Sequence, residues 1–239
     1  MKKNSFKFLI LIFVVFIGSR TFSQILYKNE GVSKSVGRVS SGELINGYKL
    51  PYKGENFKYF SPFSYYILNR SFVHSKVYHT IIDSYKLCEE DCPDIQFRIM
   101  ECSTKKGGRA FPHITHQIGL SVDFMTPLIK ENKPKKTYDH TGIWRYLMNF
   151  DKDGKANINS SVEIDFNTIA KHIINLNKAA KKNGLKIKKI ILEINLKDDL
   201  FKSEEGKKLK NYNIYFVKKL SPKIDKLHDD HYHVDFEVL

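Results

Sequence analysis

The chain has 239 residues, of which 40 are lysine or arginine and 26 are aspartate or glutamate, giving a formal net charge of +14. Aromatic residues make up 13% of it and we find no low-complexity tract or internal repeat, which excludes an intrinsically disordered chain and a repeat protein. The positive charge favours an anionic partner such as cell wall, lipid headgroups or nucleic acid, although lysines spread along a chain are more typical of a solvated surface.

The N-terminus has the pattern of an export signal. Three lysines precede an unbroken apolar run from Phe8 to Ile17. Thr21-Phe22-Ser23 then offers small residues at the positions that a signal peptidase recognises. The apolar run is too short to span a bilayer, which needs roughly twenty residues. We therefore expect residues 1–23 to be a signal peptide and residues 24–239 to be exported without a stable membrane anchor. An uncleaved anchor is the alternative.

Apolar periodicity and turn residues predict the secondary structure of the remaining chain. Asp165 is expected to cap a helix that ends at Asn183-Gly184. We predict an irregular segment (24–50), helices (72–87, 165–182 and 200–211) and strands (94–100, 120–125, 185–194 and 231–239). The mixture indicates a single domain over residues 24–239 with an α+β fold, in which helices flank a small antiparallel β-sheet core.

The three cysteines, Cys88, Cys92 and Cys102, are compatible with an oxidising compartment. Their spacing is not that of a zinc ribbon, and no second pair exists. A disulfide could join Cys92 to either of the other two. We expect at most one bridge and no catalytic role for the thiols.

Two histidine-rich clusters lie more than a hundred residues apart. The first contains His113, His116 and, after Gly119, Asp123. Gly119 permits a turn, after which the predicted strand brings Asp123 back beside His116. Imidazole nitrogens and a carboxylate oxygen are a ligand set that suits zinc better than calcium or magnesium. Taken alone, the cluster is also compatible with a turn carboxylate and surface histidines.

The second cluster contains His228, His231 and His233. In a strand, His231 and His233 point to the same face while Tyr232 points to the other. His228 lies beyond the strand and approaches only from its rim. Two distant clusters of this kind indicate one metal site assembled from two parts of the fold. Spacing alone leaves open whether His231 is a fourth ligand, which would close the site and make it structural.

The motifs His113-x-x-His116-Gln117-x-Gly119-Leu120-x-Val122-Asp123 and His228-Asp229-x-His231-x-His233-Val234 resemble those of the penicillin-insensitive murein endopeptidases. That family belongs with lysostaphin-like peptidases, D-Ala-D-Ala metallopeptidases and the hedgehog signalling domain. The similarity extends upstream through Ser41-Gly42-x-Leu44-x-x-Gly47-x-x-Leu50-Pro51, Gly54 and Gly107-Gly108, and so covers most of the chain.

The resemblance implies one Zn²⁺ per chain, held by His116, Asp123 and His233. It implies that His231 is catalytic and off the metal, and that His113 and His228 support the ligands or the substrate. The implied fold is that of the hedgehog and D-Ala-D-Ala peptidase group.

The implied activity is zinc-dependent hydrolysis of D-alanyl–diamino acid cross-links in periplasmic peptidoglycan. The alternatives are a D,D- or L,D-carboxypeptidase and a non-catalytic, zinc-containing wall-binding protein. Nucleic acid is not an expected partner, since export is predicted and no nucleic-acid-binding motif is recognised. One departure is Asp235, which stands where the family commonly has a basic residue; we expect it to alter the charge beside the cleft.

Overall fold

The computed structural model describes residues 26–111 and 113–239, and the predicted signal peptide therefore lies outside the described residues. Within these ranges, no helix is long and apolar enough to cross a membrane. The strands are β1 (Lys34–Arg38), β2 (Ser41–Ile45), β3 (Tyr48–Lys49), β4 (Phe57–Tyr59), β5 (Phe72–Val73), β6 (Phe97–Ile99), β7 (Ser121–Met125), β8 (Leu128–Lys130), β9 (Lys133–Pro134), β10 (Lys155–Ala156), β11 (Asn159–Ile164), β12 (Leu185–Ile191) and β13 (His231–Val238). The helices are η1 (Phe63–Ile67), α2 (Ser75–Asp91), η2 (Lys136–His140), η3 (Gly142–Leu147), α3 (Phe166–Lys182), α4 (Leu196–Lys202), α5 (Glu204–Leu209) and α6 (Pro222–Lys226).

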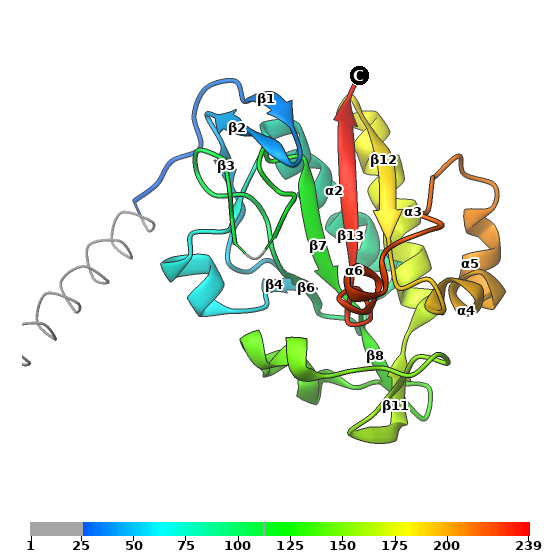
Figure 1. Cartoon of the computed structure of the whole chain (residues 1–239). Helices are drawn as coiled ribbons and strands as arrows, with labels where there is room; N and C mark the ends of the chain where they lie inside the picture. Colours follow the sequence, from blue (N-terminus) through cyan, green and yellow to red (C-terminus); the bar gives the residue numbers. More distant parts are fainter. Residues whose placement is uncertain (1–25, 112) are drawn as a thin grey trace, which may run out of the picture.

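The central sheet has five strands in the order β12-β13-β7-β6-β4 (Figure 1). Its neighbours pair antiparallel except β4 and β6, which are parallel. A second sheet, in the order β10-β11-β8-β9, continues from β7 at one end of the molecule. Two small antiparallel pairs, β1-β2 and β3-β5, lie near the other end of β7. The predicted α+β fold with helices flanking a largely antiparallel sheet is confirmed.

Alternation along β7 and β13 divides the central sheet into an apolar face and a polar face. Phe124 and Tyr232 stack with ring centroids 5.5 Å apart. Both rings contact His172 of α3, which also stacks on Tyr85 of α2 at 5.1 Å. Helices α2 and α3 therefore cover one face of the sheet (Figure 1). The intervening residues of β7 and β13 point to the opposite face, where the histidines gather.

The α3 helix forms as its sequence predicts. The Asp165 carboxylate accepts a hydrogen bond from the Thr168 backbone N–H at 3.0 Å, which satisfies one of the free donors of the first turn. The helix ends at Lys182, and Gly184 beyond it has φ of 68°, a left-handed conformation that glycine adopts without steric cost. Strand β12 begins directly afterwards, as predicted.

Several predicted elements differ from the structure. The segment 24–50, predicted to be irregular, contains the β1-β2 hairpin and β3. Two of its glycines, Gly37 and Gly42, are strand residues, and at Gly42 a Cβ atom would lie 2.1 Å from the Val36 carbonyl oxygen of the paired strand. The helix predicted over 200–211 is two short helices, because extended Ser203 separates them and caps α5 with its hydroxyl.

The cysteines are all free and buried, so neither candidate disulfide is present. Cys92 caps the C-terminus of α2, and its backbone N–H donates to the Cys88 carbonyl oxygen. A hydrogen bond between the two thiols, together with burial, raises the pKa of Cys88 well above its usual value. These thiols pack in the hydrophobic core with Cys102.

Candidate metal centre

The pairing of β7 with β13 brings the two sequence clusters together. In this antiparallel ladder His233 stands opposite Asp123, and Asp235 opposite Ser121. The His233 Nδ1 atom lies 2.7 Å from the Asp123 Oδ1 atom, although the two residues are 110 positions apart. Because a change of register by one residue would turn either side chain to the helix-covered face, the register itself assembles the site.

His116 reaches the same carboxylate from the loop before β7. Its backbone has φ of 70°, an uncommon left-handed conformation for a residue with a side chain, and Gly119 then makes the turn with φ of 71°. His116 Nδ1 lies 3.2 Å from the Ser121 carbonyl oxygen and donates to it. The opposite nitrogen, Nε2, faces the carboxylate and lies 3.2 Å from Asp123 Oδ2. The predicted turn and the predicted approach of His116 to Asp123 are confirmed.

Asp123 is the centre of the cluster and is only 1% exposed. Burial alone would raise the pKa of its carboxyl, but the imidazoles of His116, His231 and His233 outweigh burial and hold that pKa well below its usual value. Burial likewise opposes a charge on His233, yet its two carboxylate partners raise the pKa of this histidine to about 9. The position between Asp123 and His233 thus favours positive charge.

His231 lies on the same face of β13, as predicted, and is held by a carboxylate of its own. Its Nδ1 atom donates to Asp230 Oδ1 at 2.6 Å. The Nε2 atom then faces the centre at 3.9 Å from Asp123 Oδ2, farther than the corresponding atoms of His116 and His233. Burial lowers the pKa of His231, but the nearby carboxylates of Asp123 and Asp230 outweigh burial and raise it.

His113 and His228 flank the cluster from opposite sides. The His113 Nδ1 atom is 4.0 Å from Asp123 Oδ2, and its ring centroid is 5.3 Å from that of His116. His228 Nδ1 donates to the Ile224 carbonyl oxygen at 2.7 Å, and its ring centroid lies 5.0 Å from that of His231. Burial lowers the pKa of His113 to about 3 and that of His228 to about 4, so both rings are neutral near pH 7.

These residues include a group able to hold a metal ion. His113, His116 and Asp123 each offer a ligand atom, and these atoms all lie within 4.8 Å of one another. His233 contacts the same aspartate more closely than His113 does. Imidazole nitrogen and carboxylate oxygen in a buried cluster match the ligand chemistry of zinc. The residues present therefore fit a zinc ion, with either His113 or His233 as the third protein ligand.

Three residues at the centre were missed as site residues by sequence reasoning. Asp230 holds His231, whereas Asp229, the acidic residue of the recognised motif, accepts from the Phe150 N–H and from Lys226. Ser121 holds His116. Asp235 was expected to lie beside the cleft, but it is 1% exposed and lies beneath His233. The sequence held two signals: Asp230 is adjacent to His231, and Asp235 follows His233 by two residues in the predicted strand.

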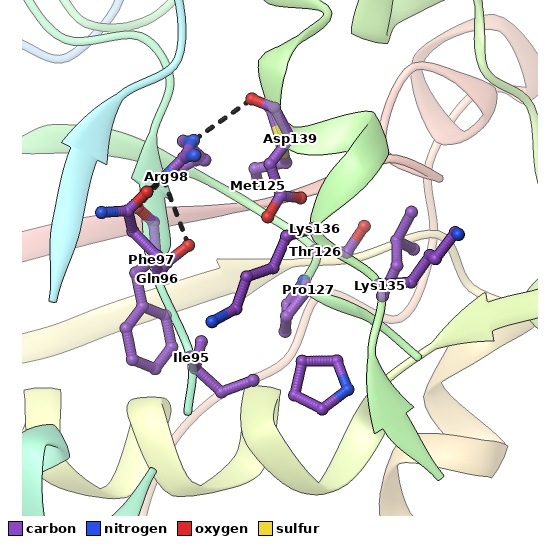
Figure 2. Close-up of a pocket in the computed structure, with 12 residues that line it drawn as sticks. Ile95, Gln96, Phe97, Arg98, Met125, Thr126, Pro127, Lys135, Lys136 and Asp139 are labelled. Carbon is purple, nitrogen blue, oxygen red and sulfur yellow. Dashed lines mark hydrogen bonds between the residues drawn. The ribbon is translucent and has the colours of Figure 1, made fainter. Parts of the chain in front are cut away.

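A separate pocket lies between β6 and the η2 segment (Figure 2). Its wall includes Arg98, whose Nη1 donates to Gln96 Oε1 at 2.9 Å and whose Nε donates to the Asp139 carbonyl oxygen at 3.2 Å. None of the clustered histidines lines it. This pocket is therefore distinct from the candidate metal centre.

A buried histidine–aspartate group on the polar face of an α+β sheet defines a protein with a candidate metal centre. Comparison with protein families then identifies which class this is: the model of the penicillin-insensitive murein endopeptidases matches residues 35–238. The chain belongs to this peptidase family, and the resemblance seen in its motifs is confirmed. No curated protein matches the chain.

Proposed function

We propose that this protein is a zinc-dependent endopeptidase that hydrolyses D-alanyl–diamino acid cross-links of peptidoglycan in the periplasm. The convergence of His116, His233 and His231 on the buried Asp123 carboxylate carries the proposal. Membership of the murein endopeptidase family supports peptidoglycan as the substrate, and the predicted signal peptide supports export. Residues 24–239 act as one domain in this proposal.

The proposed zinc ligands are His116 through Nε2, Asp123, and His233 through Nδ1. These two nitrogens face the Asp123 carboxylate. The other nitrogen of each ring is hydrogen-bonded, that of His116 to the Ser121 carbonyl oxygen and that of His233 to Asp235. When bound, zinc would act as a Lewis acid and lower the pKa of its coordinated water to about 7. His113 lies at the edge of the same group and is proposed to orient substrate or water rather than bind the ion.

His231 is the proposed catalytic residue. Its Nδ1–H is bonded to Asp230, so Nε2 is the atom that faces the centre and exchanges a proton there. In the protonated form it donates to the developing oxyanion of the scissile carbonyl, and it then passes the proton to the leaving amine. Asp230 stabilises the ring while it carries the proton, and the His228 ring lies beside it with the two centroids 5.0 Å apart.

The decisive experiment follows the products of a cross-linked muropeptide dimer by mass spectrometry. We expect the mature protein to convert the dimer to monomers, to stop with a chelator and to recover when zinc is returned. His116→Ala should abolish turnover, whereas His140→Ala, which changes an exposed histidine outside the cluster, should not.

Two other results would redirect the assignment. Cleavage of monomeric stems alone would replace the endopeptidase with a carboxypeptidase. Zinc-loaded protein that binds sacculi without cutting any stem would replace both with a wall-binding protein. An intact dimer in the presence of stoichiometric zinc is thus the result that contradicts the proposal.

A further inference from the structure

A second row of polar residues lies directly beneath the proposed metal ligands. Strand β13 is flanked by β12 and β7, and Asp235 is in register with Lys189 on the first and Ser121 on the second. This row is one same-face step along the strands from the pair formed by His233 and Asp123. It follows that Lys189, Asp235 and Ser121 form a layer that supports the site.

Every oxygen of the Asp235 carboxylate has a partner within this layer or in the layer above. Oδ1 accepts from the Ser121 hydroxyl at 2.5 Å and from His233 Nε2 at 2.8 Å. Oδ2 pairs with the Lys189 ammonium at 3.2 Å. A carboxylate that is 1% exposed is costly to bury unless it is paired in this way. The three contacts therefore hold Asp235 in one orientation and offset the free-energy cost of burying its charge.

Ser121 connects the two histidine ligands through this layer. Its carbonyl oxygen accepts from His116 Nδ1, and its hydroxyl donates to the carboxylate that holds His233. Each histidine is thereby held by the nitrogen that faces away from Asp123. A neutral imidazole carries one N–H and one lone pair, so a partner that takes the N–H directs the lone pair toward the metal.

We propose that Asp235, supported by Ser121 and Lys189, is a positioning residue that fixes the orientation and tautomer of His233 for metal binding. The inference rests on the proposed zinc site and deepens it. Carboxylates that accept from a metal-bound histidine increase the basicity of the ligand, and their removal typically weakens metal affinity about 10–100-fold. Asp235 touches neither metal nor substrate in this role, since it acts through His233.

Zinc affinity of the folded protein, measured by competition with a chromophoric chelator, tests the inference independently of peptidase activity. We expect Asp235→Leu to weaken zinc binding by about 100-fold and Asp235→Asn, which keeps an acceptor without the charge, by about 10-fold. The matched control is Lys186→Met, which removes the ammonium that pairs with partly exposed Glu237 on the same two strands and leaves every contact of Asp235 in place. It should change affinity less than about threefold, as expected for a surface ion pair.

The absorption spectrum of the cobalt-substituted protein adds a readout that a purely structural role would leave unchanged. We expect its visible bands to shift in Asp235→Asn and not in the control Lys186→Met. Wild-type zinc affinity in folded Asp235→Leu would overturn the inference while leaving the zinc site intact. If Asp235→Leu does not fold, wild-type affinity and spectrum in Asp235→Asn would overturn it instead. Wild-type protein that binds no zinc would overturn the proposed function itself.

Discussion

His172 on α3 offers a quantitative test of how burial determines the acid stability of this fold. Its ring is fully buried between Tyr85 and the sheet residues Phe124 and Tyr232. The Nδ1 atom is hydrogen-bonded to the Tyr232 hydroxyl, and burial lowers the pKa of the imidazole to about 3. Replacing His172 with Phe keeps an aromatic ring there and removes the titrating group.

The size of the effect follows from the difference between folded and unfolded protein. Because the folded-state pKa lies below the usual value of about 6.5, the unfolded chain takes up a proton first as the pH falls. The contribution of neutral His172 is fully present above pH 6.5 and is lost progressively towards pH 3. Between pH 7 and pH 5 this loss amounts to about 2 kcal/mol, at 1.36 kcal/mol for each pH unit.

Urea unfolding at pH 7 and pH 5 measures this difference. We expect His172→Phe to lose about 2 kcal/mol less than the wild type over this interval. The larger ring adds a packing cost of about 1–3 kcal/mol that is the same at both pH values and therefore cancels. Tyr232→Phe, which keeps the imidazole, is the matched control and should retain the wild-type dependence. Identical pH dependence in His172→Phe and wild type would refute the reasoning.

Three further predictions concern the metal centre and its loop. We expect His233→Ala to lose stoichiometric zinc and His113→Ala to retain it by elemental analysis; the reverse result would make His113 the third ligand. Asp230→Asn should retain zinc but lower kcat by about 10²–10⁴-fold, since the carboxylate that stabilises charged His231 is lost; an unchanged kcat would remove that role. Gly107→Ala should destabilise the protein by more than 2 kcal/mol, or roughly twice the effect of Gly108→Ala. Both glycines have positive φ, but an added Cβ at Gly107 meets the Gln117 carbonyl oxygen at 2.2 Å, whereas at Gly108 it meets nothing within 4 Å; equal losses in urea unfolding would contradict this explanation.

The elements that the sequence predicts best are those with a local signal. Helix α3 has a capping aspartate and a glycine stop, and β7, β12 and β13 have alternating or β-branched runs. The segment 126–164 had no such signal, yet it forms β8 to β11 and two short helices because of its pairing within the second sheet. The hairpin β1-β2 was missed because its glycines resemble turn residues, while in the structure they allow two strands to approach closely.

The candidate metal centre was predictable to the extent that its proposed ligands recur in short motifs. His116 lies in the loop directly before the strand that carries Asp123, and His233 lies in a single alternating run. These residues could therefore be recognised as candidate ligands from local sequence alone. The layer beneath them was not, because Lys189, Asp235 and Ser121 meet only through the register of three strands. A carboxylate next to a histidine motif gives no indication of whether it faces solvent or supports the ring.

The position of β13 has a consequence for how the protein acquires its activity. This strand lies between β12 and β7, and it pairs with β7 across a separation of 110 residues between Asp123 and His233. Contacts over such long separations form late and slowly compared with local ones. A chain interrupted before residue 231 lacks both a central strand and two of the clustered histidines. The proposed ligands therefore come together only once β13 has paired with β7, which makes assembly of the candidate metal centre a late step of folding.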